Sequence, residues 1–173
     1  MGGRRVESVR WFPLAYRLDG RVRYLAWCDD SAAPLLLDAA GRIAAYDTLA
    51  ELTVQAARLH LPLQPEPPPL YDLDRLALHL ATLRPVTIDC ALLLESWNLF
   101  TDIAASLRWS HFDPKPRRTQ QLYEKLFWGS NLPAMTPAGR PYRPLWSVRE
   151  MRALRIVLTD GLRLFSNTVV TGA

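Results

Sequence analysis

Several features are scarce in this 173-residue chain, and each scarcity excludes a class of protein. There are only two cysteines, Cys28 and Cys90, and they lack CxxC spacing, so we interpret them as reduced core thiols rather than a disulfide framework or zinc site. No apolar run approaches the roughly 20 residues that a membrane-spanning helix needs. The basic start of the chain has no apolar stretch behind it, which does not fit a secretory signal. We therefore expect a cytoplasmic protein without a membrane partner.

Recognisable catalytic and metal-binding motifs are also missing. The three histidines lie in separate segments without a partner at metal-ligand spacing: His60, His79 and His111. Ser130 lacks the flanking glycine of a nucleophile turn, and the chain has neither a P-loop nor a dinucleotide fingerprint. Glu95 and Asp102 share a helix face but lie about 10 Å apart along its axis, which is too far for paired acid–base chemistry. We therefore expect no catalytic residues, no metal and no cofactor, and we keep an enzyme with an unrecognised site as a third hypothesis.

The composition is that of one folded domain. Apolar residues make up 49% of the chain and charged residues 22%, which is a normal globular balance. The length fits a single domain over residues 1–173. Strand signals concentrate in residues 8–46 and helix signals in residues 48–169, so we expect a sheet-rich first part and a helical remainder.

Alternating apolar residues and turn residues predict two β-hairpins. Asp19 and Gly20 separate two alternating runs within residues 8–28, and Asp-Gly is a strong hairpin signal. Residues 34–38 and 42–46 flank a second turn at residues 39–41. The two hairpins predict a small four-stranded antiparallel meander, with Pro13 at the start of a strand or on an edge.

Helical spacing and capping residues predict four to five helices after this meander. Capping boxes open helices at Thr48 and at Ser147, and Asp74 is expected to cap a short helix that ends near residue 83. Residues 87–107 form the clearest long helix, with apolar positions on several sides, and residues 119–128 form a further one. The five prolines in residues 62–69 predict an extended connector that crosses within the domain. The fold class is therefore α+β: a small antiparallel β-meander packed against four to five α-helices.

The segment after residue 126 predicts a helix end followed by a structured loop. Gly129 is expected to provide a left-handed C-terminal turn, and Asn131 to satisfy backbone groups of the loop. Such features specify a fold rather than a reaction.

Charge is distributed unevenly along the chain, whose net charge is +4. Residues 24–74 carry two basic and eight acidic residues, whereas residues 108–155 carry ten basic and three acidic residues. A contiguous acidic block in a basic protein is a candidate interaction face. The carboxylates that we expect to contact a partner are Asp29, Asp30, Glu66, Asp72 and Asp74. Asp38 and Asp47 are weaker candidates, since one ends a strand and the other precedes a helix.

Four aromatic stretches in the second half carry a resemblance to a known family. They are Glu95-Ser96-Trp97-Asn98-Leu99-Phe100-Thr101-Asp102, the run Tyr123-Glu124-Lys125-Leu126-Phe127-Trp128-Gly129-Ser130-Asn131-Leu132-Pro133, Tyr142-Arg143-Pro144-Leu145-Trp146-Ser147 and Gly161-Leu162-Arg163-Leu164-Phe165. As a set they resemble bacterial immunity proteins of contact-dependent growth inhibition and related polymorphic-toxin systems. The resemblance covers residues 90–166 and implies a small cytoplasmic protein that binds the C-terminal domain of a cognate toxin and occludes its active site. Nucleases are common targets in such systems. The matched residues carry over as framework and not as binding residues.

A second hypothesis comes from the basic region of residues 108–155. Lys115, Arg117 and Arg118 follow Trp109, His111 and Phe112, and such a mixture can bind phosphates and stack bases. The alternative function is therefore a nucleic-acid-binding accessory protein, although no nucleic-acid-binding fold signature accompanies the cluster.

Overall fold

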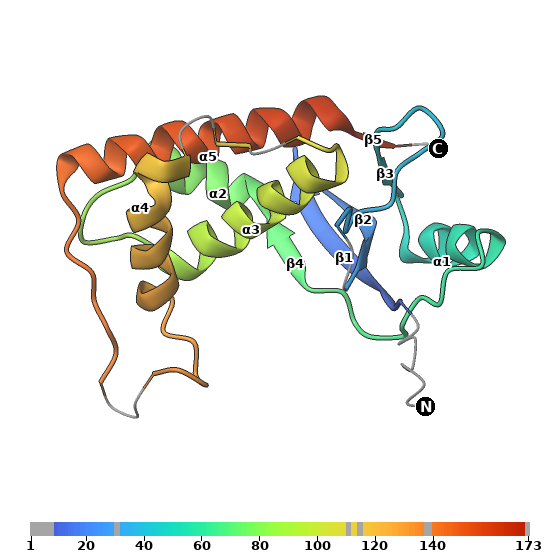
Figure 1. The fold of residues 1–173 in the computed structure, drawn as a ribbon, viewed down its shortest axis with the longest axis horizontal. Helices are drawn as coiled ribbons and strands as arrows, with labels where there is room; N and C mark the ends of the chain where they lie inside the picture. Colours follow the sequence, from blue (N-terminus) through green and yellow to red (C-terminus); the bar gives the residue numbers. More distant parts are fainter. Residues whose placement is uncertain (1–8, 30–31, 110–111, 114–115, 137–139, 172–173) are drawn as a thin grey trace, which may run out of the picture.

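The structure is a computed structural model that describes residues 9–29, 32–109, 112–113, 116–136 and 140–171 (Figure 1). This described part of the chain contains five helices and five strands. Their order is β1 (Trp11–Leu18), β2 (Arg21–Cys28), β3 (Ile43–Ala45), α1 (Leu49–Arg58), β4 (Leu70–Asp72), α2 (Leu73–Ala81), α3 (Cys90–Ser106), α4 (Pro116–Gly129), α5 (Val148–Thr168) and β5 (Val169–Thr171). The predicted α+β class is confirmed.

The main sheet is mixed, and in this respect the expectation of a purely antiparallel meander is wrong. Strands β1 and β2 form the predicted antiparallel hairpin around Asp19 and Gly20, which both adopt a positive φ. Strand β4 pairs with β1 in parallel, giving the order β2-β1-β4. The second predicted hairpin is reduced to isolated bridges such as Leu37 to Ile43. Strand β3 pairs instead with β5, again in parallel.

The proline-rich connector explains the parallel pairing of β4. The amide of Gln64 donates to the carbonyl of Trp11 at 2.7 Å, and the amide of Ala15 donates to the carbonyl of Pro69 at 2.9 Å. Prolines have no amide hydrogen but keep a carbonyl, so the connector can still accept hydrogen bonds from the open edge of β1. It therefore leads the chain along β1 in the same direction and confirms the predicted intradomain crossing.

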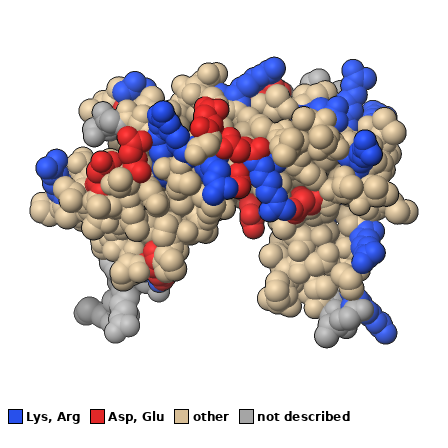
Figure 2. Space-filling view, turned by 180° about the vertical axis from the view of Figure 1, so that it is seen from behind, with Lys and Arg blue, Asp and Glu red and all other residues tan. Residues whose placement is uncertain are grey.

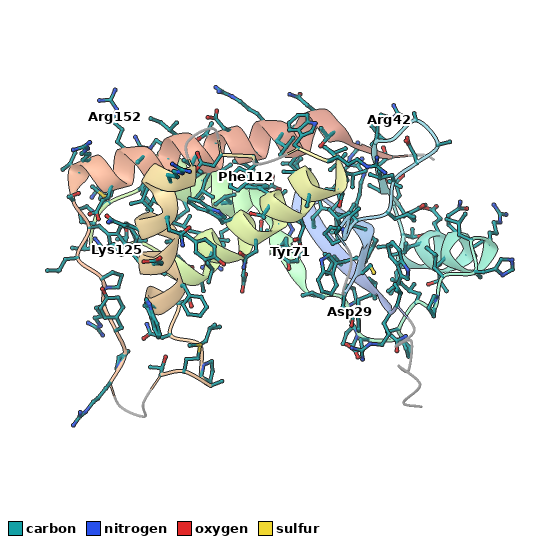
Figure 3. All side chains as sticks on the ribbon, viewed as in Figure 1. Asp29, Arg42, Tyr71, Phe112, Lys125 and Arg152 are labelled. Atoms are coloured by element: carbon teal, nitrogen blue, oxygen red, sulfur yellow. The ribbon has the colours of Figure 1, made fainter. Side chains whose placement is uncertain are left out.

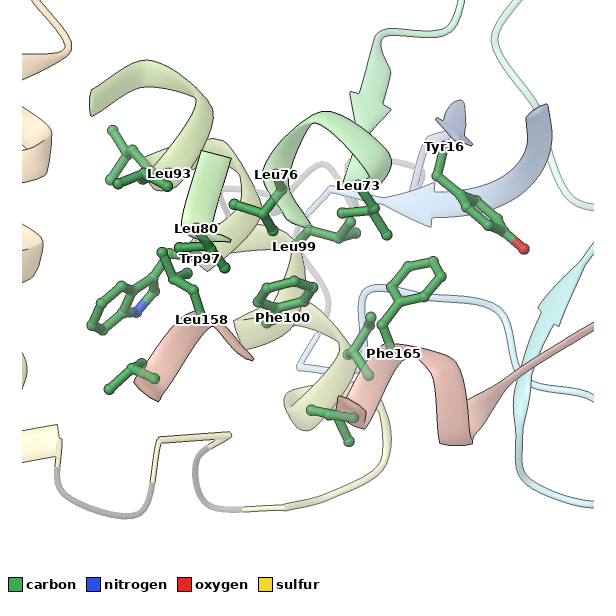
Figure 4. Packing of buried hydrophobic residues seen from close by; sticks show 14 of the residues in the cluster. Tyr16, Leu73, Leu76, Leu80, Leu93, Trp97, Leu99, Phe100, Leu158 and Phe165 are labelled. Atoms are coloured by element: carbon green, nitrogen blue, oxygen red, sulfur yellow. The ribbon is translucent and has the colours of Figure 1, made fainter. Parts of the chain in front are cut away.

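Helix α3 lies at the centre of the fold. Eleven of its 17 residues are buried, and it packs against α2, α4 and α5, as its several-sided apolar pattern predicts. Helix α5 lies close to α3, since a Cβ atom on Gly161 would overlap the Phe100 ring. One turn further along α5, the Phe165 ring meets Tyr16 of β1 edge-on, with ring centroids 4.8 Å apart. Figure 4 shows this core, in which Phe100 and Phe165 lie between α3, α5 and the sheet.

Both predicted capping boxes are present, but two terminal residues act differently from the prediction. Asp72 caps α2, because its side chain accepts from the amide of Arg75 at 2.9 Å. The Asp74 carboxylate instead accepts from the amides of Asp19 and Gly20 in the β1–β2 turn, each at 2.8 Å. Gly129 ends α4 without a positive φ.

The left-handed residue after α4 is Asn131, with φ of 52°. A Cβ atom on Gly129 would lie 2.6 Å from the Cys90 sulfur, so close packing and not a left-handed turn requires glycine there. Asn131 bonds both the amide and the carbonyl of Tyr142, which confirms its predicted role in the loop. The loop is thereby closed onto the end of α4.

Helix α5 runs along one edge of the molecule above α2 and α3, with α4 and the sheet on opposite sides of α3 (Figure 1). Seen from behind, a notch separates two lobes (Figure 2). One lobe contains the sheet and α1, and the other contains α4 and the loop that follows it. Among the described helices, none is long and apolar enough to cross a membrane.

Candidate partner-binding groove on helix α3

A polar stripe on α3 interrupts its otherwise buried surface. Glu95, Asn98 and Thr101 are exposed and Asp102 is half-buried, whereas their neighbours Trp97, Leu99 and Phe100 are buried. Steps of three and four residues place these polar side chains on one face of a 3.6-residue helix. Hollows in the surface lie on both sides of this stripe, and we name the stripe together with the two hollows the α3 groove.

The hollow between α3 and the sheet is lined by aromatic rings, prolines and two carboxylates. Its volume is about 400 Å³, within the range of ligand-binding pockets. Phe12 and Trp27 are cross-strand partners in β1 and β2, and their ring centroids lie 6.0 Å apart. Tyr71 of β4 adds a third ring, and Figure 3 shows it just beneath α3. The remaining lining residues are Pro13, Leu14, Glu66, Pro67, Pro69, Asn98 and Asp102.

Asp102 is the polar centre of this sheet-side hollow. The indole nitrogen Nε1 of Trp27 donates to its Oδ2 at 3.0 Å. Burial raises the pKa of Asp102, and the Trp27 hydrogen bond opposes that shift only in part. Burial also raises the pKa of Tyr71, with smaller contributions from the charges of Asp102 and Glu95. The site is therefore partly shielded from water and rich in negative charge.

The second hollow lies between α3 and α4 and has a volume of about 350 Å³. Trp97 forms part of its wall and meets Tyr123 edge-on, with ring centroids 5.8 Å apart. The Tyr123 hydroxyl donates to Oδ1 of Asn98 at 3.1 Å. Asn98 lines both hollows, so they meet at this residue.

Three of the carboxylates predicted to contact a partner have partners within the chain. Asp29, labelled in Figure 3, forms an ion pair with Arg10 at 2.7 Å. Asp72 forms an ion pair with Arg17 at 2.7 Å besides capping α2, and Asp74 holds the β1–β2 turn. Reversing their charges would therefore disturb the fold as well as any interface.

The other two predicted carboxylates differ from these. Glu66 is exposed and lines the sheet-side hollow, so the structure brings one of the five into the α3 groove. Asp30 lies outside the described residues, as do His111 and Lys115 of the basic cluster. Asp38 and Asp47 also form ion pairs, with Arg42 and Arg23, so four of the seven described carboxylates of the acidic block are neutralised within the chain.

Basic residues in the second half of the chain form ion pairs less often than the carboxylates of the acidic block do. Four exposed arginines form no ion pair with the described residues: Arg140, Arg143, Arg149 and Arg152. Figure 2 shows Lys and Arg side chains along the outer side of the lobe that contains α4 and its loop. These four arginines therefore add uncompensated positive charge to the second half of the chain.

None of the protein-family models matches this chain, and neither does any curated protein sequence. One solved structure shares the fold. The crystal structure of the SatS C-terminal domain in complex with bromine superposes with a TM-score of 0.58. It is 17% identical, and the match covers 99% of this chain and 100% of that domain. Likeness at this identity shows a common architecture alone.

The environments of His79 and of the two cysteines are those of residues in a folded core. Nε2 of His79 accepts from the amide of Asp89 at 3.1 Å, and burial lowers the pKa of His79. Cys28 and Cys90 are both buried, as the sequence predicts for core thiols. In the part of the chain that the structure describes, no group of three or more His, Cys, Asp or Glu residues could hold a metal ion.

Proposed function

We propose that this chain is a bacterial immunity-type protein that binds and neutralises a cognate toxin domain through the α3 groove. The observation that supports binding is the groove itself: two aromatic-lined hollows meet at Asn98 beside a polar stripe on the central helix α3. Apolar hollows with a few placed polar groups are typical of binding sites. In this proposal the protein acts in the cytoplasm without catalysis, and the bound segment of the toxin is held away from its substrate.

The choice of a toxin as partner comes from the resemblance of residues 90–166 to immunity proteins. The resembling stretches supply the walls of the groove as well as the core. Trp97, Asn98 and Tyr123 belong to them and line the helix-side hollow. The proposal therefore assigns partner contacts to residues that the resemblance by itself implies only as framework.

The experiment is co-expression with the C-terminal domain encoded by the neighbouring upstream gene. We expect the chain to restore growth and to co-purify with that domain. Asn98→Arg places a long charged side chain where the hollows meet, and it should abolish protection while the protein remains folded. Gln121→Arg is the matched control, because Gln121 is exposed on α4 and outside both hollows. A neighbouring gene without a toxin domain, or full protection by Asn98→Arg, would contradict the proposal.

A second candidate function, nucleic-acid binding, is favoured by the four uncompensated arginines of the loop after α4 and the start of α5. Phosphate contacts by Arg140, Arg143, Arg149 and Arg152 would release counterions, so the affinity would fall steeply with salt. This function is supported if a nucleic-acid column retains the wild type at low salt but does not retain the double variant Arg149→Ala/Arg152→Ala. Absence of retention at low salt rejects it.

A further inference from the structure

The residues that line the sheet-side hollow are of the types that bind cations. The faces of aromatic rings carry negative charge and attract cations within about 6 Å of the ring centroid. Three different rings line this hollow: Phe12, Trp27 and Tyr71. The Phe12 ring already attracts a cation of this chain, since the guanidinium carbon of Arg10 lies 5.6 Å from its centroid. Arg10 does not line the hollow, so the hollow itself remains open.

The charges of the hollow are all of one sign. Asp102 lies on α3 and exposed Glu66 comes from the connector, and no Lys, Arg or His is among the described lining residues. In the described part of the chain, the Trp27 indole is the only hydrogen-bond donor to the Asp102 side chain. A partly desolvated carboxylate is costly unless an opposite charge and further hydrogen bonds accompany it. Among the described residues, this carboxylate has one hydrogen bond and no counter-ion.

We propose that the sheet-side hollow binds an organic cation, a guanidinium or alkylammonium group, held beside the Asp102 carboxylate and against the rings of Phe12, Trp27 and Tyr71. The inference rests on the proposed function insofar as an arginine or lysine of the bound segment carries this cation. A free small molecule with the same cationic group would fit the hollow equally well. In either case the volume of about 400 Å³ is sufficient for the charged group and its alkyl stem.

Other occupants fit the hollow less well. An apolar side chain would displace water from Asp102 and Glu66 without supplying a charge or a donor, so the burial of these carboxylates would be uncompensated. An anion would be repelled by both carboxylates. A cation gains from the rings and the carboxylates at once, and a planar guanidinium can in addition stack on an aromatic face.

The first test uses N-acetyl-arginine amide as the probe and N-acetyl-citrulline amide as the matched neutral control. The indole N–H resonance of Trp27, assigned by its loss in Trp27→Phe, reports on the hydrogen bond to Asp102. We expect the arginine probe to shift this resonance in a saturable manner and the citrulline control to leave it unchanged. Equal shifts by both probes, or no shift by either, would overturn the proposal.

Variants test whether the carboxylates attract the cation. Asp102→Asn keeps an oxygen that can accept from Trp27 but removes the charge, and it should weaken binding of the arginine probe at least tenfold. Glu66→Gln should weaken binding two- to fivefold, and it remains informative if Asp102→Asn does not fold, because Glu66 is exposed. Asp160→Asn on α5 is the control and should change nothing. Unchanged affinity in both hollow variants would overturn the assignment.

A binding measurement with a peptide distinguishes the two sources of the cation. A pentapeptide with a central arginine that binds at least tenfold more tightly than the single-residue probe indicates a polypeptide partner, whereas equal affinity indicates a free small molecule. Both results support the cation site. Failure of the proposed function is distinguishable, because toxin protection is measured by growth and co-purification. A protein that protects but ignores the arginine probe refutes the cation site alone, and one that binds the probe without protecting refutes the immunity role alone.

Discussion

Replacing Gly161 with alanine tests a close approach between two helices of the core, α5 and α3. Gly161 lies within α5, where alanine is the better helix former by about 1 kcal/mol. If space were free, the substitution would therefore stabilise the protein. The structure predicts the opposite, because the added Cβ would overlap Cδ2 of Phe100 and lie 2.6 Å from Cε2. Carbon atoms in favourable contact are about 3.5–4.0 Å apart.

The expected magnitude follows from how little the Phe100 ring can move. Phe100 is fully buried and meets the Phe112 ring edge-on, with centroids 5.8 Å apart. Overpacking of a closed core costs about 1–3 kcal/mol, and an overlap of this size belongs at the upper end. After subtraction of the gain in helix propensity, we expect a net loss of about 2 kcal/mol in the free energy of unfolding. For a chain of this length, that corresponds to about 4–8 °C in Tm.

Urea unfolding followed by circular dichroism at 222 nm measures this loss, and a double-mutant cycle identifies its cause. Phe100→Leu alone is destabilising, since it leaves a cavity, but it removes the ring atoms that alanine would meet. In the Phe100→Leu background we therefore expect Gly161→Ala to cost little or to stabilise. A Gly161→Ala variant as stable as the wild type, or an equal loss in both backgrounds, would refute the close approach of α5 to α3.

Three further predictions concern single groups. Burial raises the pKa of Asp102 above its unfolded value near 3.9, so the folded state binds the proton more tightly than the unfolded state does. The free energy of unfolding therefore falls as the pH rises from about 4 through the raised pKa. Asp102→Asn removes this loss, and its urea midpoint should exceed that of the wild type at pH 7 but not at pH 3; parallel pH profiles would contradict this. Asp74→Ala removes two hydrogen bonds to the β1–β2 turn and should cost about 1–2 kcal/mol, whereas Glu66→Gln should leave the urea midpoint unchanged. Burial raises the pKa of the Cys90 thiol to about 11, so at pH 8 Ellman's reagent should modify it only after denaturation; rapid modification of native Cys90 would show an accessible thiolate.

Local signals of the sequence predict the elements of this fold well. The Asp19-Gly20 turn and the two capping boxes depend on residues within four positions of one another, and each forms as predicted. The parallel pairing of β4 and of β5 is not predictable in this way. Both strands are three residues long, and their positions depend on how the connector returns along β1 and where α5 ends.

The candidate site is less predictable, because its residues meet only in the folded chain. Trp27 and Asp102 are 75 positions apart, and nothing in either segment indicates their hydrogen bond. The sequence does contain the polar stripe of α3, which can be found as exposed positions on an otherwise apolar helix. Formal charge is a poor guide to the acidic residues, since Asp29 and Asp72 are paired with arginines that lie elsewhere in the sequence. Of the four described members of the predicted set, only Glu66 lies in the groove.

The pairing of β3 with β5 has a consequence for the synthesis of this protein. Residues 43–45 bond with residues 169–171, so β3 depends on a strand that is synthesised long after it. A chain still emerging from the ribosome can form the β1–β2 hairpin and α1, but β3 must wait for its partner. Ladders between such distant segments also form slowly, since a long loop has to close first. Until then the edge of β3 is exposed to other nascent chains, and shielding it during translation would increase the yield of folded protein.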